Sequence, residues 1–193
     1  RNIQSNKILN KLKLKKNEFF LISTHREENV ENSKKFKTIV ELILYLKKKY
    51  KKKIVISCHP RINKKINKQN KLLDKNIIIA KPFSYSEYMK LQTNALLTIS
   101  DSGTITEESS ILNFKAINLR NNHERPEGME EASVILSSLV LKNVINAVEI
   151  MVKNNFKNHI PTDYSKDNIS DKVIKIIISY IEYVKRYVWL NEK

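Results

Sequence analysis

The stretch LLTISDSGTITEE, residues 96–108, joins an apolar run to a polar loop and the start of a helix. Residues 96–99 form a short apolar run typical of a buried strand. The polar residues that follow include Gly103, one of only two glycines in the chain. The two acidic side chains at the end of the stretch suit the first turn of a helix. The stretch therefore predicts a strand, a tight loop and a helix in succession.

The same kind of apolar run recurs on both sides of this stretch. Continuous apolar strands that are joined by crossovers of roughly ten residues or more indicate a parallel sheet with helices on both faces. We therefore expect an α/β fold, a Rossmann-like doubly wound parallel sheet. The other four predicted strands are residues 19–22, 54–56, 77–79 and 116–119.

A helix is expected between the first two of these strands. Apolar residues recur there at the spacing of one helix face, and Asn32 or Ser33 would cap the first turn. The residues on the apolar face are Phe36, Ile39, Val40, Ile43 and Leu44.

The charge balance invites a nucleic-acid interpretation, because the 193 residues carry a formal net charge of +16. Basic surfaces release counterions when they bind a phosphate backbone. However, 30 of the 36 basic residues are Lys, which favours an ordinary solvated surface. The chain also lacks a basic strand interleaved with aromatics and a recognition-helix motif. We expect one domain, residues 1–193, without a nucleic-acid partner, and keep a basic nucleic-acid-binding module as a distant alternative.

Cysteine content and hydropathy bear on the compartment. The single cysteine, Cys58, excludes an internal disulfide framework and fits a reducing, cytoplasmic location. Apolar runs stay well short of the roughly 20 residues that span a bilayer. We therefore expect a cytoplasmic protein without a membrane partner.

Unusual residues gather in the loops that follow the predicted strands. A doubly wound sheet binds its ligand at the carboxyl ends of its strands. Together, these loops hold three of the four His, four of the six Arg, the only Cys and both Gly. The sequence thus predicts a ligand site formed by residues 23–30, 57–63, 80–86, 100–106 and 120–128.

The loop around Gly103 has two interpretations. The start of a helix attracts phosphate through its unpaired N–H groups, and a glycine lets the phosphate come close. Ser102 would add a hydroxyl donor, and Glu108 would accept from sugar hydroxyls beside the phosphate. The alternative is an ordinary capping box with an acidic first turn.

Three other loops carry further candidate contacts. His25 and Arg26 follow the first strand, where a dense charged loop favours ligand binding over a purely structural histidine. His59 follows the second strand. Arg120 and Arg125 follow the fifth, where a guanidinium would clamp a diphosphate or simply form an exposed salt bridge. No pair of His or Cys residues has the spacing of a metal motif, so we expect no metal.

Three segments at these loops carry a family resemblance. STHREEN at 23–29, DSGTITEE at 101–108 and ERPE at 124–127 are similar, in order and separation, to signatures of the non-hydrolysing UDP-N-acetylglucosamine 2-epimerases. That family has a glycosyltransferase-B-like architecture of two Rossmann-like domains with the active site between them. The resemblance implies that this chain is the second, C-terminal domain.

The resemblance also implies roles for individual residues. Ser102, Gly103 and Arg125 would hold the diphosphate, and Glu108 would bind the ribose hydroxyls. His25 would be the catalytic residue, beside the sugar–phosphate linkage where the leaving group departs.

Tyr88 falls where the family places an aromatic residue near uracil, although it also fits a core position. Arg26, His59 and Arg120 remain as possible further contacts.

The implied reaction is the elimination of UDP across C1–C2 and its return after the C2 proton is replaced on the other face. The family keeps the proton-transferring carboxylates on the first domain, so this half is expected to be inactive alone. The implied partners are a UDP-N-acetylhexosamine substrate and the missing N-terminal domain, in a homodimer when full length. Neither nicotinamide nor another cofactor is implied.

Departures from the family pattern point to a branch. Thr104 stands where many members have a second Gly, and Glu27 where a second Arg is frequent. Residues 121–132 resemble the UDP-2-acetamido-2,6-dideoxy-L-talose 2-epimerases of capsule or O-antigen polysaccharide biosynthesis. A glycosyltransferase with the same two-domain architecture is the main alternative among enzymes.

The last predicted element is a helix over residues 170–190, capped near Ser170. Its apolar stripe is expected to pack on this domain, while its distal part, residues 183–190, reaches toward the missing N-terminal domain. The stripe consists of Val173, Ile177, Ile181, Val184 and Val188.

Overall fold

The computed structural model describes residues 3, 5–26, 29, 31–58, 65–66, 69, 72, 74–122, 124–156 and 159–190, with Cys58 described by its backbone only. The chain divides into two compact units, Arg1–Pro161 and Thr162–Lys193.

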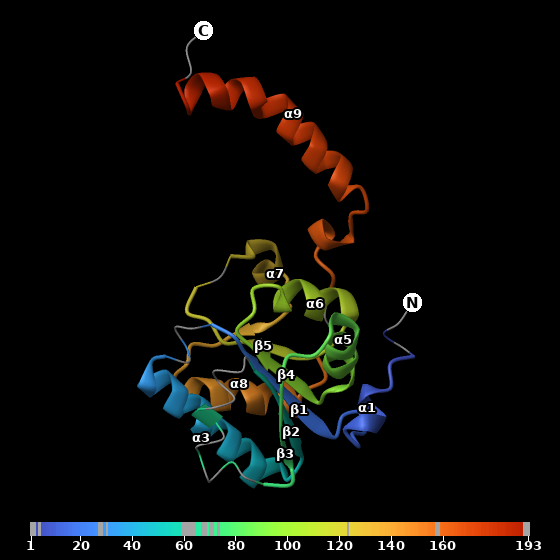
Figure 1. The fold of residues 1–193 in the computed structure, drawn as a ribbon, viewed down its shortest axis with the longest axis vertical. Helices are drawn as coiled ribbons and strands as arrows, with labels where there is room; N and C mark the ends of the chain where they lie inside the picture. The colour runs from blue at the N-terminus through green and yellow to red at the C-terminus, as the bar shows by residue number, and fades with distance from the viewer. Residues whose placement is uncertain are drawn as a thin grey trace. The chain divides into compact units, whose positions relative to one another are not determined.

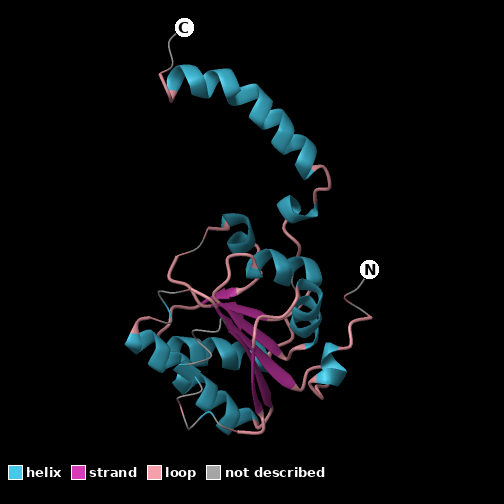
Figure 2. Cartoon of the chain, in the orientation of Figure 1, coloured by secondary structure: helices cyan, strands magenta, loops and turns pink. Residues whose placement is uncertain are grey.

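Strands and helices alternate along most of the first unit, where β3 follows β2 as the next element described (Figures 1 and 2). In chain order, its strands and helices are α1 (Ile8–Lys11), β1 (Phe19–Thr24), α3 (Ser33–Tyr50), β2 (Lys53–Cys58), β3 (Ile77–Ala80), α5 (Tyr85–Asn94), β4 (Leu97–Ser100), α6 (Ile105–Leu112), β5 (Ala116–Asn118), α7 (Pro126–Glu130), β6 (Ile135–Leu136) and α8 (Leu141–Lys153).

The described strands form one parallel sheet in the order β3-β2-β1-β4-β5-β6. The chain order reverses between β1 and β4, where the two strands pair with Ser23 opposite Ser100. Their carboxyl ends therefore lie side by side, at the point where a doubly wound sheet opens a crevice for a ligand. The predicted Rossmann-like fold is confirmed.

Helices cover both faces of the sheet (Figure 1). Phe20 and Ile22 of β1 belong to a cluster with buried side chains of α3 and α8. The alternate residues, Phe19 and Leu21, pack instead with residues of α1 and α5. All four of these β1 side chains are fully buried. Truncating such a residue to Ala costs about 3–5 kcal/mol for Phe and about 2–5 kcal/mol for Leu or Ile.

Several local predictions can be compared with the structure. The five predicted strands are confirmed to within a few residues at their ends. The cap of α3 is Asn32, whose side chain accepts from the N–H groups of Lys34 and Lys35. The sixth strand, β6, was missed because only two residues of it pair with β5.

The second unit contains a 3-10 turn, η2 (Thr162–Ser165), and the helix α9 (Ile169–Tyr187). The predicted cap at Ser170 is wrong, since the helix begins at Ile169 after Asn168. Taken alone, this unit buries none of the apolar side chains of α9. The packing of its apolar stripe on the first unit stays a prediction. Within the described residues, no helix has the length and apolar character needed to cross a membrane.

Candidate functional site

Asp101 holds the two loops at the β1–β4 junction together. Its carboxylate accepts from the backbone N–H of His25 at 3.0 and 3.2 Å and from that of Arg26 at 3.1 Å. The Asn29 amide donates a further bond of 3.1 Å to it. The side chain is only 1% exposed, so these donors replace the water that an ionised carboxylate needs.

Asp101 was not among the predicted site residues. Its position gives one signal, since it is a carboxylate placed directly between a buried strand and the Ser102–Gly103 loop.

His25 extends from this junction with an exposed side chain. Its ring Nε2 lies 2.8 Å from the hydroxyl oxygen of Ser23, a buried residue of β1. The backbone bond to Asp101 fixes the start of the side chain, and the Ser23 hydroxyl fixes its tip. The imidazole is therefore held at the carboxyl edge of the sheet next to the loop after β4.

The loop from Ser102 to Thr104 is closed by its own hydroxyl groups. The Ser102 Oγ lies 3.0 Å from the Thr104 Oγ1 and accepts from the Thr104 N–H at 3.4 Å. The capping box that was the alternative interpretation of this loop is not formed, because the Thr104 side chain makes no capping bond to the start of α6. Its hydroxyl donates instead to the Glu108 carboxylate, at 2.7 Å. The Thr104 side chain thus provides no cap for the start of α6.

Gly103 is explained by close packing rather than by an unusual backbone angle. Neither of the two glycines has a positive φ, so neither is required by a left-handed backbone conformation. A Cβ built on Gly103 would lie 3.2 Å from Nη1 of Arg120. The guanidinium of Arg120 would therefore have to move by a few tenths of an ångström to admit a side chain at this position.

Glu108 is held from both sides on the first turn of α6. In addition to the Thr104 bond, its Oε2 accepts from Nε2 of Gln92, on α5, at 2.7 Å. Gln92 is fully buried. Gln92 was not predicted from the sequence, since only the packing of α5 beside α6 reveals its contact.

Tyr88 combines a core position with a polar tip. Its ring is partly buried against the cluster that contains Phe19 and Leu21. Burial raises the pKa of the Tyr88 hydroxyl, and the Ser23 and Ser100 hydroxyls offset part of that shift. The core interpretation thus describes the ring, while the hydroxyl faces the carboxyl ends of β1 and β4.

Two arginines follow β5, and each pairs with a carboxylate. Arg120 is 7% exposed and donates to Glu124 at 2.7 Å. This bond holds the pKa of the Glu124 carboxyl below its usual value. Arg125 forms an ion pair with Glu107 of α6 and also donates to the Glu124 carbonyl at 3.1 Å. The salt bridges that were the alternative interpretation of this loop are therefore formed. Both guanidinium groups lie near the start of α6.

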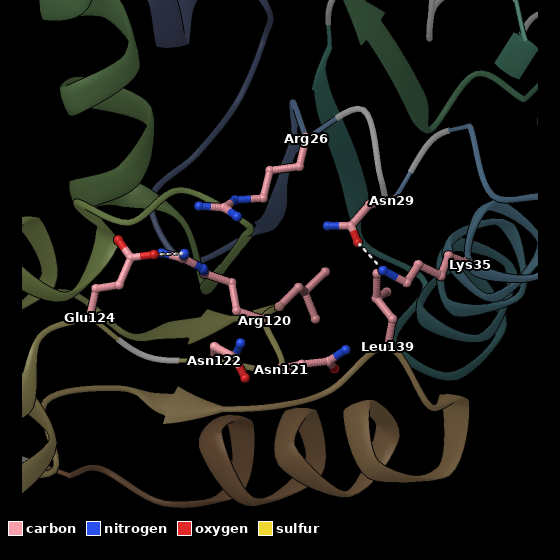
Figure 3. A pocket seen from close by; sticks show the side chains of 9 residues that line it. Arg26, Asn29, Lys35, Arg120, Asn121, Asn122, Glu124 and Leu139 are labelled. Atoms are coloured by element: carbon pink, nitrogen blue, oxygen red, sulfur yellow. Dashed lines mark hydrogen bonds and ion pairs between the residues drawn. The ribbon is translucent and has the colours of Figure 1, made fainter.

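A pocket of about 200 Å³ brings together two of the residues that we considered as further contacts. Arg26 and Arg120 both line it, with Glu124 beside Arg120 (Figure 3). On the opposite side, Lys35 donates to the Asn29 side chain at 3.3 Å. Three cations and one carboxylate thus line a space of a size and charge suited to a small anionic group. His59 lies outside the described residues.

The described part of the chain contains no cluster of three or more His, Cys, Asp or Glu side chains able to hold a metal ion. The groups available at the junction are hydroxyls, an imidazole, guanidinium groups, helix N–H groups and the carboxylate of Glu108. Such groups bind anions and polar hydroxyl compounds.

Comparison with known proteins identifies the family. Residues 1–178 match the family model described as UDP-N-acetylglucosamine 2-epimerase. The chain belongs to this family. The resemblance of the three sequence segments is thereby confirmed, and the epimerase interpretation is favoured over a glycosyltransferase domain and over a nucleic-acid-binding module.

Relatives within the family are similar in sequence and in structure. The UDP-N-acetylglucosamine 2-epimerase of Methanococcus maripaludis is 38% identical over 170 residues, covering 86% of this chain. The structure of the Rickettsia bellii epimerase superposes with a TM-score of 0.80 at 36% identity over 98% of this chain. The Methanocaldococcus jannaschii epimerase, solved in complex with UDP-GlcNAc and UDP, has a TM-score of 0.75 at 33% identity over 93% of this chain.

The chain spans about half the length of these family members. It covers 46% of the Methanococcus maripaludis enzyme, 52% of the Rickettsia bellii chain and 51% of the Methanocaldococcus jannaschii chain. This coverage is consistent with one domain of the expected two-domain architecture.

Proposed function

We propose that this chain is the UDP-binding, C-terminal half of a UDP-N-acetylglucosamine 2-epimerase, an isomerase that inverts C2 of a UDP-N-acetylhexosamine. The observation that carries the proposal is the Asp101 network, which holds His25 against the loop of Ser102 and Gly103 in a member of this family. The related Methanocaldococcus jannaschii enzyme in complex with UDP-GlcNAc and UDP supports the same class of ligand here.

The diphosphate is assigned to the start of α6. The Ser102 hydroxyl and the N–H groups at the start of α6 would be the donors, and Gly103 carries no side chain that would hinder the approach of the diphosphate. Arg125 lies on the next loop and would exchange its contact with Glu107 for the diphosphate. Fixed donors of this kind stabilise charge that develops on a leaving group without first having to reorganise.

The remaining contacts follow from their places around the junction. Glu108 would accept from the ribose hydroxyls, and Tyr88 would lie near uracil. His25 would assist the departure of UDP, since its imidazole is held beside the loop that binds the diphosphate. Arg26 and Arg120 would add positive charge from the neighbouring pocket.

The proposed reaction divides between two domains. The C2 proton is not acidic, so bond breaking depends on stabilising the departing diphosphate, and this chain performs that task. Removal and return of the proton require carboxylates with tuned pKa values, which we assign to the N-terminal domain. UDP leaves and returns as the same group, so the proposal needs no cofactor. We assign residues 183–190, the distal part of α9 and the residues after it, to contact with the N-terminal domain, and the full-length enzyme to the cytoplasm as a homodimer.

The finer assignment concerns the sugar. Thr104 and residues 121–132 favour UDP-2-acetamido-2,6-dideoxy-L-talose, for capsule or O-antigen polysaccharide, over UDP-GlcNAc. A direct comparison of the two UDP-sugars as substrates of the full-length enzyme decides between them.

Calorimetric titration of the 193-residue chain with UDP tests the binding assignment. We expect modest affinity for UDP and weaker binding of UMP and uridine, because each lost phosphate removes charge-assisted hydrogen bonds. Absence of both heat and NMR shift changes at about 1 mM UDP would contradict the assignment.

Deuterium incorporation at C2 in D2O tests the division of labour. The isolated chain should give no exchange above background, while the full-length enzyme should exchange C2. Exchange by the purified 193-residue chain would place the proton-transferring groups on this half.

A further inference from the structure

Gln92 is a fully buried amide whose hydrogen bonding is incomplete. Its exposed fraction is 0%, and its Nε2 donates to Glu108 at 2.7 Å. Its Oε1 is buried and has no hydrogen-bond partner among the described residues. The orientation of the amide is set by its neighbour, because a carboxylate accepts from the NH2 group and would repel the carbonyl oxygen.

An incompletely bonded buried amide is an unfavourable choice for simple core packing. A buried polar atom without a partner costs free energy, and an apolar side chain of similar size would avoid that cost. The hydrogen bond of Gln92 is directed at one carboxylate oxygen on the neighbouring helix, and its amide also lies beside the Tyr88 hydroxyl. Its presence is therefore better explained by what it does to Glu108 than by what it adds to the core.

The two donors fix Glu108 without using up its capacity as an acceptor. Thr104 donates to Oε1 and Gln92 donates to Oε2, each at 2.7 Å. An ionised carboxylate has about four lone-pair sites, so roughly two remain for a ligand. The carboxylate is also incompletely buried, which leaves those sites accessible. Glu108 is thus oriented in advance for hydroxyl groups that approach from outside.

We propose that Gln92 is a positioning residue that orients the Glu108 carboxylate toward the ribose hydroxyls of UDP and so sets the preference for ribonucleotides over deoxyribonucleotides. The inference rests on the proposed function, because it takes Glu108 to be the ribose contact. A site built to bind a hydroxyl discriminates against a ligand that lacks it, since its polar groups are then left unpaired. The discrimination requires that the carboxylate be held in one orientation.

The test compares UDP with 2′-deoxy-UDP by calorimetry on the 193-residue chain. The variants are Gln92→Leu, which removes the donor at similar volume, and Glu108→Gln, which removes the proposed acceptor charge. Thr93→Val is the matched control, because the bonds of the Thr93 hydroxyl within the described residues go to backbone carbonyls and the Asn94 amide. Thermal unfolding of each variant is measured in parallel.

We expect Gln92→Leu to weaken UDP by about fivefold and 2′-deoxy-UDP by less than about twofold, since only the ribose contact depends on the orientation of Glu108. Glu108→Gln should lower the UDP preference at least as much, and Thr93→Val should leave it unchanged. The melting temperature of Gln92→Leu should stay near that of the wild type, which separates positioning from a structural effect.

Two failures are distinguishable. If Glu108→Gln lowers the UDP preference and Gln92→Leu preserves it, Gln92 is a core residue and the inference is overturned while the proposed function stands. If Glu108→Gln preserves the preference, or the wild-type chain binds neither nucleotide, the assignment of the ribose contact fails and the inference fails with it.

Discussion

The candidate site contains two groups of polar residues that are held in different ways. The junction cluster consists of Ser23, His25, Arg26, Asn29 and Asp101, and its central carboxylate is bonded mainly by backbone N–H groups. The β5 cluster consists of Glu107, Arg120, Glu124 and Arg125, and it is held by ion pairs between side chains.

This difference separates a preformed part of the site from one that must change partners. Backbone donors to Asp101 are fixed by the pairing of β1 with β4, so the geometry exists before a ligand arrives. In the β5 cluster, Glu107 competes with an incoming diphosphate for Arg125. Partly exposed ion pairs contribute only about 0–1 kcal/mol, so such an exchange is inexpensive. The junction cluster thus has its binding geometry before the ligand arrives, whereas the β5 cluster provides a guanidinium that can exchange Glu107 for the diphosphate.

The largest expected effect comes from Asp101→Asn in the junction cluster. The substitution keeps the size of the side chain but turns an amide toward several N–H donors, which loses charge-assisted bonds in a buried place. We expect a loss of about 2–4 kcal/mol in the free energy of unfolding, measured by urea denaturation.

UDP binding should weaken in the same variant, because His25 and the Ser102 loop lose their common anchor. Asp163→Asn, on the exposed η2 turn, is the control and should behave as the wild type. A stable Asp101→Asn variant with unchanged UDP affinity would show that the junction is not preformed by this carboxylate.

An intermediate effect is expected when the two sides of the Arg125–Glu107 pair are changed separately. Arg125→Ala should weaken UDP by about 1.5–3 kcal/mol, the range for a hydrogen bond to a charged group. Glu107→Gln should tighten UDP by up to about 1 kcal/mol, because it removes the internal competitor. Calorimetry measures both changes.

Opposite signs are the informative result for this pair. Arg186→Ala removes the same charge from the exposed surface of α9 and serves as the control. If Arg125→Ala and Glu107→Gln weaken UDP binding equally, the pair has a structural role. The β5 cluster would then not exchange partners when the ligand binds.

The strands of the fold were predictable from the sequence where the mainly apolar runs were at least three residues long. Short runs of mainly apolar residues predicted β1 to β5, and the rule that ligands bind at the carboxyl ends of the strands then placed His25, Ser102 and Gly103 on neighbouring loops. β6 was missed because its two residues become a strand only through pairing with β5. A strand of two residues is too short to show an apolar pattern that could be recognised in the sequence.

The contacts of the site were less predictable than its location. Asp101 accepts from backbone groups 75 and 76 positions away, and every residue type carries such an N–H, so no motif marks the partners. Gln92 lies on α5 and Glu108 on α6, and the two side chains meet because these helices pack side by side in the folded protein. The role of Arg120 beside Gly103 likewise depends on the packing of two loops. The roles assigned to Tyr88 and Arg125 in binding UDP stay predictions.

The smallest expected effect tests the charge state of the β5 cluster. Hydrogen bonding to Arg120 lowers the pKa of Glu124 below its ordinary value of 4.5. A carboxyl whose folded pKa is depressed stabilises the fold above its unfolded pKa, and this contribution is lost as pH falls through the folded value. The melting temperature of the wild type should therefore fall more steeply below pH 4.5 than that of Glu124→Gln.

Because Glu124 is largely exposed, solvent screens the pair and the difference should be small. Glu182→Gln removes the same charge from α9 and should follow the wild-type curve, so that a change in net charge alone does not explain the result. Identical pH curves for the wild type and Glu124→Gln would mean that Arg120 gains nothing from this carboxylate. Arg120 would then be held by its packing against Gly103, and the β5 cluster would resemble the junction cluster in being fixed by the fold rather than by exchangeable charge.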